Sequence, residues 1–156
     1  MRLTEYDAKI NKNNGLTELY KCKAYNYDNP YPTLYTPETV YKMLTTIYSL
    51  DEKAEEYVYM ISLNTRCKPI GIFNIAKGTV NSCIMPIRET FIRALLSGAV
   101  FIIIVHNHPS GDTTPSADDI KVTKKLNDAG ELIGIKLLDH IIIGNSFLSM
   151  KSNGYY

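Results

Sequence analysis

Residues 100–105 constrain the fold of this chain more than any other segment. The run VFIIIV is β-branched or aromatic throughout, and no polar residue interrupts it. Such a continuous apolar run is typical of a β-strand that is buried on both faces. The segment therefore predicts a strand that lies inside a covered sheet.

Three other segments have the apolar spacing of helices. They span about residues 36–47, 86–98 and 117–129. Thr36 and Pro37 are typical of an N-cap and a first helical position, and Gly98 and Gly130 are placed to end the second and third helices. Apolar residues repeat at helical spacing along the expected inward faces: Val40, Met43, Leu44 and Ile47; Ile87, Phe91, Ala94 and Leu95; Val122, Leu126 and Ala129.

The remaining patterned segments predict strands at residues 56–63, 69–75, 78–84, 135–143 and 147–150. The first two are expected to pair antiparallel across a turn, and the last two to join at residues 144–146. Helices inserted between strands indicate an α/β fold with a mixed, largely antiparallel sheet. Residues 1–35 are polar and tyrosine-rich, with the breakers NNG and NPYP, and are interpreted as an irregular or edge-packing arm before a domain at 36–156.

Composition narrows the class of protein. The chain has 156 residues, of which 45% are hydrophobic and 21% charged, as in one soluble globular domain. The net charge of +1 gives no overall attraction to nucleic acid or an anionic membrane, and no apolar run is long enough to cross a bilayer. The cysteines at positions 22, 67 and 83 form no C-x-x-C pair, so reduced thiols and a cytoplasmic location are expected.

The residues that carry chemistry follow the central strand directly. His106 and His108 stand at its end at positions i and i+2, so their side chains project to the same face. Asp119 lies in the first turn of the expected third helix, where it can supply a carboxylate ligand after the turn at residues 109–111. Three such ligands leave a fourth position for water, as in catalytic zinc sites, and manganese or iron also accept them.

Each part of this pattern also has a purely structural interpretation. An H-x-H pair by itself occurs in solvated turns. Ser116 and Asp119 together fit a capping box at the start of a helix. The metal-site prediction depends on the conjunction, in order, of strand end, histidine pair, tight turn and acidic helix start.

The spacing of His106, His108, Ser116 and Asp119 resembles the signature of the JAMM (MPN+) metalloproteases. The segments GTVNSCIMPIRETFIRAL, HNHPSGDTTPSADD and LLDHIIIG are similar to the RadC-like branch, and the resemblance covers residues 56–154. It implies a cytidine-deaminase-like JAB1/MPN fold with a curved sheet flanked by helices, one Zn²⁺ ion, and hydrolysis of peptide or isopeptide bonds. Full-length RadC proteins carry an upstream helix-hairpin-helix module, which the tyrosine-rich arm does not resemble.

The resemblance also implies a general base. Family members use a glutamate at the start of an early strand, and the matching residue is Glu56. Ser116 would donate a hydrogen bond to the oxyanion formed during hydrolysis. For Glu55 and Glu89 a surface ion pair is the favoured interpretation. His140 is interpreted as a core residue, with contact to a metal ligand as the alternative.

The leading hypothesis is a zinc-dependent peptidase or isopeptidase that acts on a peptide or protein substrate. One alternative is a DNA-associated protein with a repair role, as RadC-like proteins have been labelled, although Lys121, Lys124 and Lys125 make only a short basic helix face. Another is a non-catalytic MPN scaffold, against which the complete ligand set argues. The sequence names neither the substrate nor the oligomeric state.

Overall fold

The structure, a computed structural model, describes residues 1–28, 33–34, 36–78 and 85–156. The strand expected at residues 100–105 is β5 (Phe101–Asn107), and every residue after Phe101 in it is buried. β5 pairs antiparallel with β3 (Tyr57–Leu63) and parallel with β6 (Lys136–Ile143). It therefore lies inside the sheet, as its sequence predicts.

The described part of the chain forms one seven-stranded sheet in the order β2-β1-β4-β3-β5-β6-β7. The other strands are β1 (Arg2–Ile10), β2 (Thr17–Asn26), β4 (Pro69–Lys77) and β7 (Phe147–Ser149). Neighbouring strands are antiparallel except in the pairs β1–β4 and β5–β6. The fold is thus α/β with a mixed, largely antiparallel sheet. The expected pairing of β3 with β4 and the turn between β6 and β7 are confirmed.

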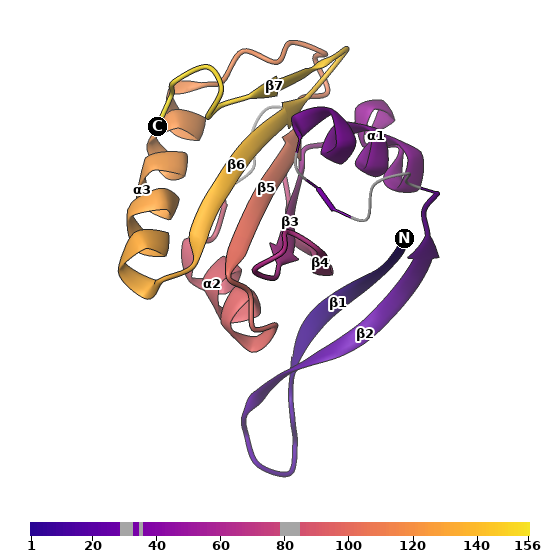
Figure 1. The fold of residues 1–156 in the computed structure, drawn as a ribbon, viewed down its shortest axis with the longest axis vertical. Helices are drawn as coiled ribbons and strands as arrows, with labels where there is room; N and C mark the ends of the chain where they lie inside the picture. The colour runs from indigo at the N-terminus through magenta and orange to yellow at the C-terminus, as the bar shows by residue number, and fades with distance from the viewer. Residues whose placement is uncertain (29–32, 35, 79–84) are drawn as a thin grey trace.

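Helices cover both faces of this sheet (Figure 1). They are α1 (Pro37–Tyr48), a short 3-10 turn (Leu50–Glu52), α2 (Ile87–Leu96) and α3 (Ala117–Ile133). α1 contributes Met43 to a core cluster that contains Ile103. On the other face, Phe91 of α2 and Leu126 of α3 pack in a cluster with Ile104. Because strand residues alternate, His106 follows Ile104 onto the face covered by α2 and α3.

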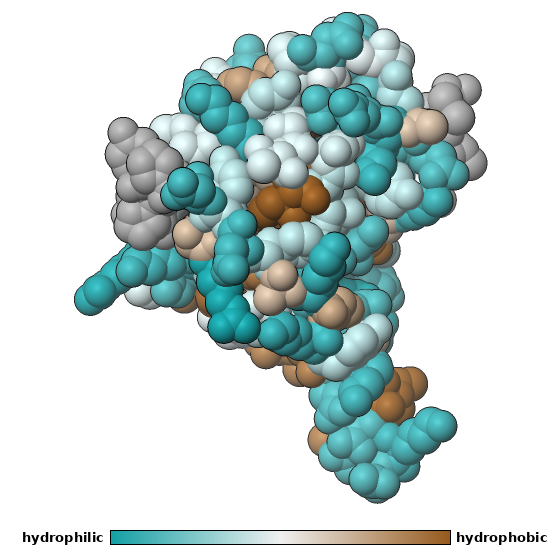
Figure 2. Space-filling model, turned by 90° about the vertical axis from the view of Figure 1, so that its right-hand side faces the viewer, coloured by the Kyte–Doolittle hydropathy of each residue, from teal (hydrophilic) through white to brown (hydrophobic). Residues whose placement is uncertain are grey.

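The irregular alternative for the arm is wrong for residues 2–10 and 17–26, where β1 and β2 form an antiparallel hairpin, and the edge-packing alternative is confirmed, because the hairpin lies at one edge of the sheet. β1 joins the sheet through the parallel pair Glu5↔Ile72, and Leu3 is buried in the core. The hairpin end projects from the body, with hydrophobic side chains among hydrophilic ones (Figure 2). Ile10 and Leu16 there are 68% and 65% exposed. Tyrosine is enriched in strands. A strand as exposed as β2 needs no alternation of apolar and polar residues, because it buries little of either face.

Two helix details also differ from expectation. Leu95 is 57% exposed, because the buried stripe of α2 runs through Thr90, Phe91 and Ala94. α3 continues past Gly130, where a Cβ atom would lie 2.5 Å from the backbone oxygen of Ile135. The helix ends instead at Gly134, whose φ of 83° is in the left-handed region.

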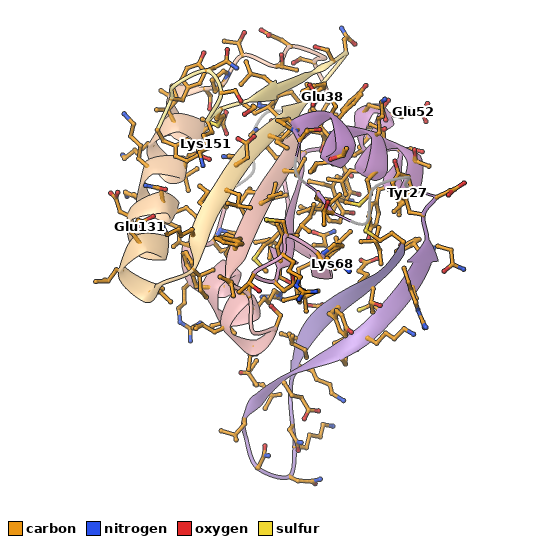
Figure 3. The ribbon with its side chains drawn as sticks, in the orientation of Figure 1. Tyr27, Glu38, Glu52, Lys68, Glu131 and Lys151 are labelled. Carbon is orange, nitrogen blue, oxygen red and sulfur yellow. The ribbon has the colours of Figure 1, made fainter. Side chains whose placement is uncertain are left out.

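Other expectations are met or untested. Thr36 caps α1 through the backbone N–H of Thr39, and Pro37 is its first residue, as predicted. The expected strand at 78–84 lies, apart from Gly78, outside the described residues, as does Cys83. No helix in the described segments is long and apolar enough to cross a membrane. On α3, Glu131 points away from the sheet (Figure 3), which marks the solvent side of this helix.

Candidate metal centre

The two histidines at the end of β5 converge at one point. His106 is 3% exposed, and its Nε2 atom lies 3.0 Å from Nε2 of His108. On the far side of its ring, His108 Nδ1 lies 2.7 Å from the backbone oxygen of Asp112. A carbonyl oxygen can only accept, so His108 donates from Nδ1. The neutral His108 ring therefore has its free lone pair on Nε2, directed toward His106.

A tight loop after the strand fixes His108. The backbone N–H of His108 donates to the oxygen of Ile143 at 2.8 Å, and that of Gly111 donates to the oxygen of His108 at 3.0 Å. Gly111 has a φ of 82°, which allows the sharp turn. Asn145 then donates to the oxygen of Gly111, and a Cβ atom at Gly144 would lie 2.4 Å from that same oxygen. The loop thus rests directly on the β6–β7 turn.

Asp119 returns to the histidines from the first turn of α3. Its Oδ1 atom is 3.4 Å from Nε2 of His106, and its Oδ2 atom is 3.6 Å from Nε2 of His108. One ligand atom from each of the three residues lies within 4.8 Å of the others. These residues, the predicted ligand set, are brought together by the end of one strand and the start of the next helix.

Ser116 holds the carboxylate of Asp119. Its hydroxyl donates to Oδ2 at 2.6 Å, and its backbone N–H donates to the same oxygen at 2.8 Å. The N–H of Asp119 donates back to Ser116 Oγ at 3.1 Å, which completes a capping box. The capping box is therefore present, and its hydrogen bonds also restrain the carboxylate that faces the histidines.

The electrostatics of His106 and Asp119 suit metal ligation, whereas those of His108 favour its protonated form, which a metal would have to displace. Burial lowers the pKa of His106 to about 4, so its ring is neutral near pH 7. Burial alone would raise the pKa of Asp119, but the hydrogen bond with His108, the electrostatic interaction with His106 and the Ser116 contacts lower it below its usual value. The hydrogen bond with Asp119 raises the pKa of His108. A neutral imidazole and an ionised carboxylate are the states that bind metals.

Of the three glutamates considered, only Glu56 interacts electrostatically with members of this centre. Burial raises the pKa of Glu56, and its charge interacts with those of His108 and Asp119. Glu55 forms an ion pair with Lys77 at 2.7 Å, and Glu89 forms one with Arg88 at 3.0 Å. Strand alternation explains the difference, because Glu56 shares a face with Val58, which pairs with His106.

Asn107, to which the sequence assigned no role, clamps the chain on both sides of Glu56. Its Oδ1 accepts from the backbone N–H of Tyr57 at 2.8 Å, and its Nδ2 donates to the backbone oxygen of Glu55 at 3.0 Å. Asn107 is 1% exposed. The only sequence signal is a buried amide between two histidines, which does not identify its partners 50 residues away.

His140 lies behind the ligands and not among them. It is fully buried, with Nε2 at 2.7 Å from Nδ1 of His106 and Nδ1 at 2.6 Å from Oγ1 of Thr123. Thr123 in turn donates to the backbone oxygen of Asp119 at 2.6 Å. The pairing of Ile104 with His140 in the parallel β5–β6 ladder brings the two histidine rings together. The geometry is consistent with both interpretations of His140, because its ring is fully buried with both nitrogens hydrogen-bonded and one of the partners is His106 of the candidate ligand set.

Comparison with known proteins identifies the family. The family model described as the RadC-like JAB domain matches residues 34–155. This stretch contains the histidine pair, Asp119, Ser116 and Glu56. The chain belongs to the RadC-like JAB domain family.

Three relatives illustrate the similarity. A UPF0758 protein of Caldanaerobacter subterraneus is 43% identical over 122 residues, which are 78% of this chain and 52% of that protein. One from Clostridium beijerinckii is 39% identical over 145 residues, or 90% of this chain and 61% of that protein. One from Clostridium tetani is 49% identical over 98 residues, or 62% and 43%. The chain spans about half the length of these curated relatives, and their names state no activity.

Proposed function

We propose that this chain is a zinc-dependent metallohydrolase, a peptidase or isopeptidase that cleaves amide bonds in a peptide or protein substrate. The observation that carries the proposal is the convergence of His106, His108 and Asp119, and the electrostatic interaction of Glu56 with His108 and Asp119 supports it. The proposal includes the finer fold assignment, a JAB1/MPN-type fold, and a cytoplasmic location.

The donor set fits a zinc ion. Two imidazole nitrogens and one carboxylate oxygen are ligands that zinc accepts in catalytic sites, where a fourth position stays open. His108 is held with its lone pair on Nε2, and Asp119 is held by Ser116, so two of the three ligands are oriented in advance. When bound, a zinc ion supplies the Lewis acidity that makes water a nucleophile near neutral pH.

Glu56 supplies proton transfer in this proposal. Its carboxylate accepts a proton from the attacking water and returns it to the nitrogen of the departing amine. Burial raises its pKa, which brings the group closer to the range in which one carboxyl can both accept and release a proton. Asn107 holds the backbone on both sides of Glu56, so the carboxylate keeps its approach to the site.

Ser116 is proposed as the donor to the oxyanion. Its hydroxyl hydrogen is committed to Asp119 Oδ2 at 2.6 Å. The catalytic role therefore requires the hydroxyl to rotate from Asp119 toward the substrate oxygen, while the backbone N–H of Ser116 keeps its own bond to the carboxylate.

No specific observation favours the two alternatives. Lys121, Lys124 and Lys125 are exposed on α3, but Asp118 and Asp128 lie on the same helix, so the basic face is interrupted. A DNA-associated protein would bind duplex DNA with an affinity that falls steeply as salt rises. A non-catalytic scaffold would still bind its partner after Glu56 is replaced, because binding would not need the base.

The proposal is tested by incubating the zinc-loaded full chain with a library of cellular peptides and isopeptide-linked conjugates. New amino termini and released conjugates are identified by mass spectrometry. We expect cleavage by the wild type and by Glu55→Gln, the matched control, and none by Glu56→Gln. Absence of cleavage by the wild type, or equal cleavage by Glu56→Gln, would overturn the proposal for the enzyme or for its base.

A further inference from the structure

Three buried polar residues lie in a line behind the metal centre. Thr123 and His140 are fully buried, and His106 is 3% exposed. The line runs from His106 Nδ1 to His140 Nε2 at 2.7 Å, from His140 Nδ1 to Thr123 Oγ1 at 2.6 Å, and from Thr123 Oγ1 to the backbone oxygen of Asp119 at 2.6 Å. The line therefore starts at one member of the ligand set and ends at another.

The hydrogen bond at the Asp119 end fixes the direction of the whole line. The backbone oxygen of Asp119 can only accept, so the single hydroxyl hydrogen of Thr123 is donated there. The sulfur of Met150, 3.5 Å from the same hydroxyl, is a weaker and more distant acceptor. Thr123 Oγ1 must therefore accept from His140, which requires a hydrogen on Nδ1 of that ring.

The next step follows from the single hydrogen of a neutral imidazole. His140 is completely buried, and its ring partners among the described residues are a hydroxyl and an imidazole, neither of which is a carboxylate that would stabilise a charge. With its hydrogen on Nδ1, His140 has a lone pair on Nε2 that faces His106 Nδ1. His106 must then donate from Nδ1, which leaves the lone pair of its Nε2 directed at His108 and Asp119.

We infer that His140 and Thr123 are positioning residues that hold His106 in the Nδ1–H tautomer, the form whose Nε2 can bind a metal. The inference deepens the proposed function, on whose metal site it rests. If each of these hydrogen bonds ran in the opposite direction, the hydrogen of His106 would lie on Nε2, where it blocks ligation. Thr123 Oγ1 would then face the Asp119 oxygen without a hydrogen between them. The hydrogen bonds that run from His106 through His140 and Thr123 to Asp119, called the relay below, also connect the ring of His106 to the backbone of Asp119. Two ligands are therefore oriented together.

The tautomers can be observed directly, without substrate. The chain contains 3 histidines, so long-range ¹H–¹⁵N correlation spectra of the metal-free, ¹⁵N-labelled full chain show three rings. We expect His106 and His140 each to show a protonated Nδ1 and an unprotonated Nε2. A His140 ring protonated on Nε2 would overturn the inference, whatever the protein does with zinc.

Variants of Thr123 test the consequence for the metal. Thr123→Val removes the hydroxyl at nearly constant shape and should weaken zinc binding by roughly ten- to a hundredfold, measured by competition with a chelator. Thr123→Ser keeps the hydroxyl and should bind zinc like the wild type. Thr90→Val is the matched control, because Thr90 is also fully buried in a helix and bonds the oxygen four residues earlier, at 2.8 Å, but contacts no histidine.

The outcomes separate the two levels of the proposal. If the wild type binds no zinc but shows the expected tautomers, the proposed function fails and the relay stands. If Thr123→Val binds zinc as tightly as Thr90→Val and keeps the His140 tautomer, the relay has no positioning role. If Thr123→Val does not fold, the tautomers of the wild type and the affinity of Thr123→Ser still decide.

Discussion

The side-chain oxygen of Asn107 accepts a hydrogen bond from the backbone N–H of Tyr57 at 2.8 Å, so the residue between the two histidines holds the strand that begins after Glu56. The second bond of Asn107, to the oxygen of Glu55, places Glu56 between two fixed points. The same short segment therefore supplies two ligands and positions the proposed base.

Replacing Asn107 with alanine should release this clamp. The N–H of Tyr57 and the oxygen of Glu55 lose their partner, and a buried group left unpaired costs about 1–3 kcal/mol. We expect the Tyr57 amide to exchange its hydrogen faster, while zinc content stays near one per folded chain. Ser62→Ala, which removes a buried hydrogen bond between a side chain of β3 and the backbone oxygen of Gly71, is the control and should leave Tyr57 protected. Unchanged protection of Tyr57 in Asn107→Ala would contradict the clamp.

The two N-caps of α1 and α3 separate the capping role of Ser116 from a catalytic one. Ser116→Ala and Thr36→Ala each remove a cap and should each lower the free energy of unfolding by about 1 kcal/mol. Only Ser116→Ala should also reduce the rate of hydrolysis, by about a hundredfold or more if Ser116 donates to the oxyanion. Equal rates per folded molecule in the two variants would leave Ser116 with the cap alone.

Gly144 provides a test of how the His108 loop is supported. In Gly144→Ala the new Cβ would lie 2.4 Å from the backbone oxygen of Gly111, so the loop must move. We expect a loss of about 1–3 kcal/mol in stability and weaker zinc binding. Gly154→Ala is the control: its φ of 72° strains the backbone, but nothing lies near its Cβ, so stability should fall without a change in zinc affinity. Wild-type zinc affinity in Gly144→Ala would show that this contact does not set the position of His108.

Local patterns were sufficient for the parts of the molecule that depend on neighbours in sequence. The alternation at the end of β5 puts His106 and His108 on one face, and the capping box at Ser116 marks the start of α3. The hairpin of β1 and β2 was missed because β2 is mostly exposed, β1 is mostly half-buried, and neither strand has an apolar alternation.

Contacts between distant segments were beyond the sequence. The choice of Glu56 over Glu55 came only from the family resemblance, because both faces of β3 are apolar and the residues alone do not give the register of β3 against β5. The contact of His140 with His106 depends on the parallel pairing of β5 with β6, which places residues 34 positions apart side by side. Burial of Thr123 and His140 together is a property of the packed structure, not of either segment.

The metal content of the purified chain tests the central claim most directly. Elemental analysis should find one zinc ion per folded wild-type chain, because three oriented ligands converge on one point. His106→Ala and Asp119→Ala should lose it, whereas Asp118→Ala, which changes the exposed neighbour in the same turn of α3, should keep it. Wild-type zinc content in His106→Ala and Asp119→Ala would contradict the assignment of the ligands.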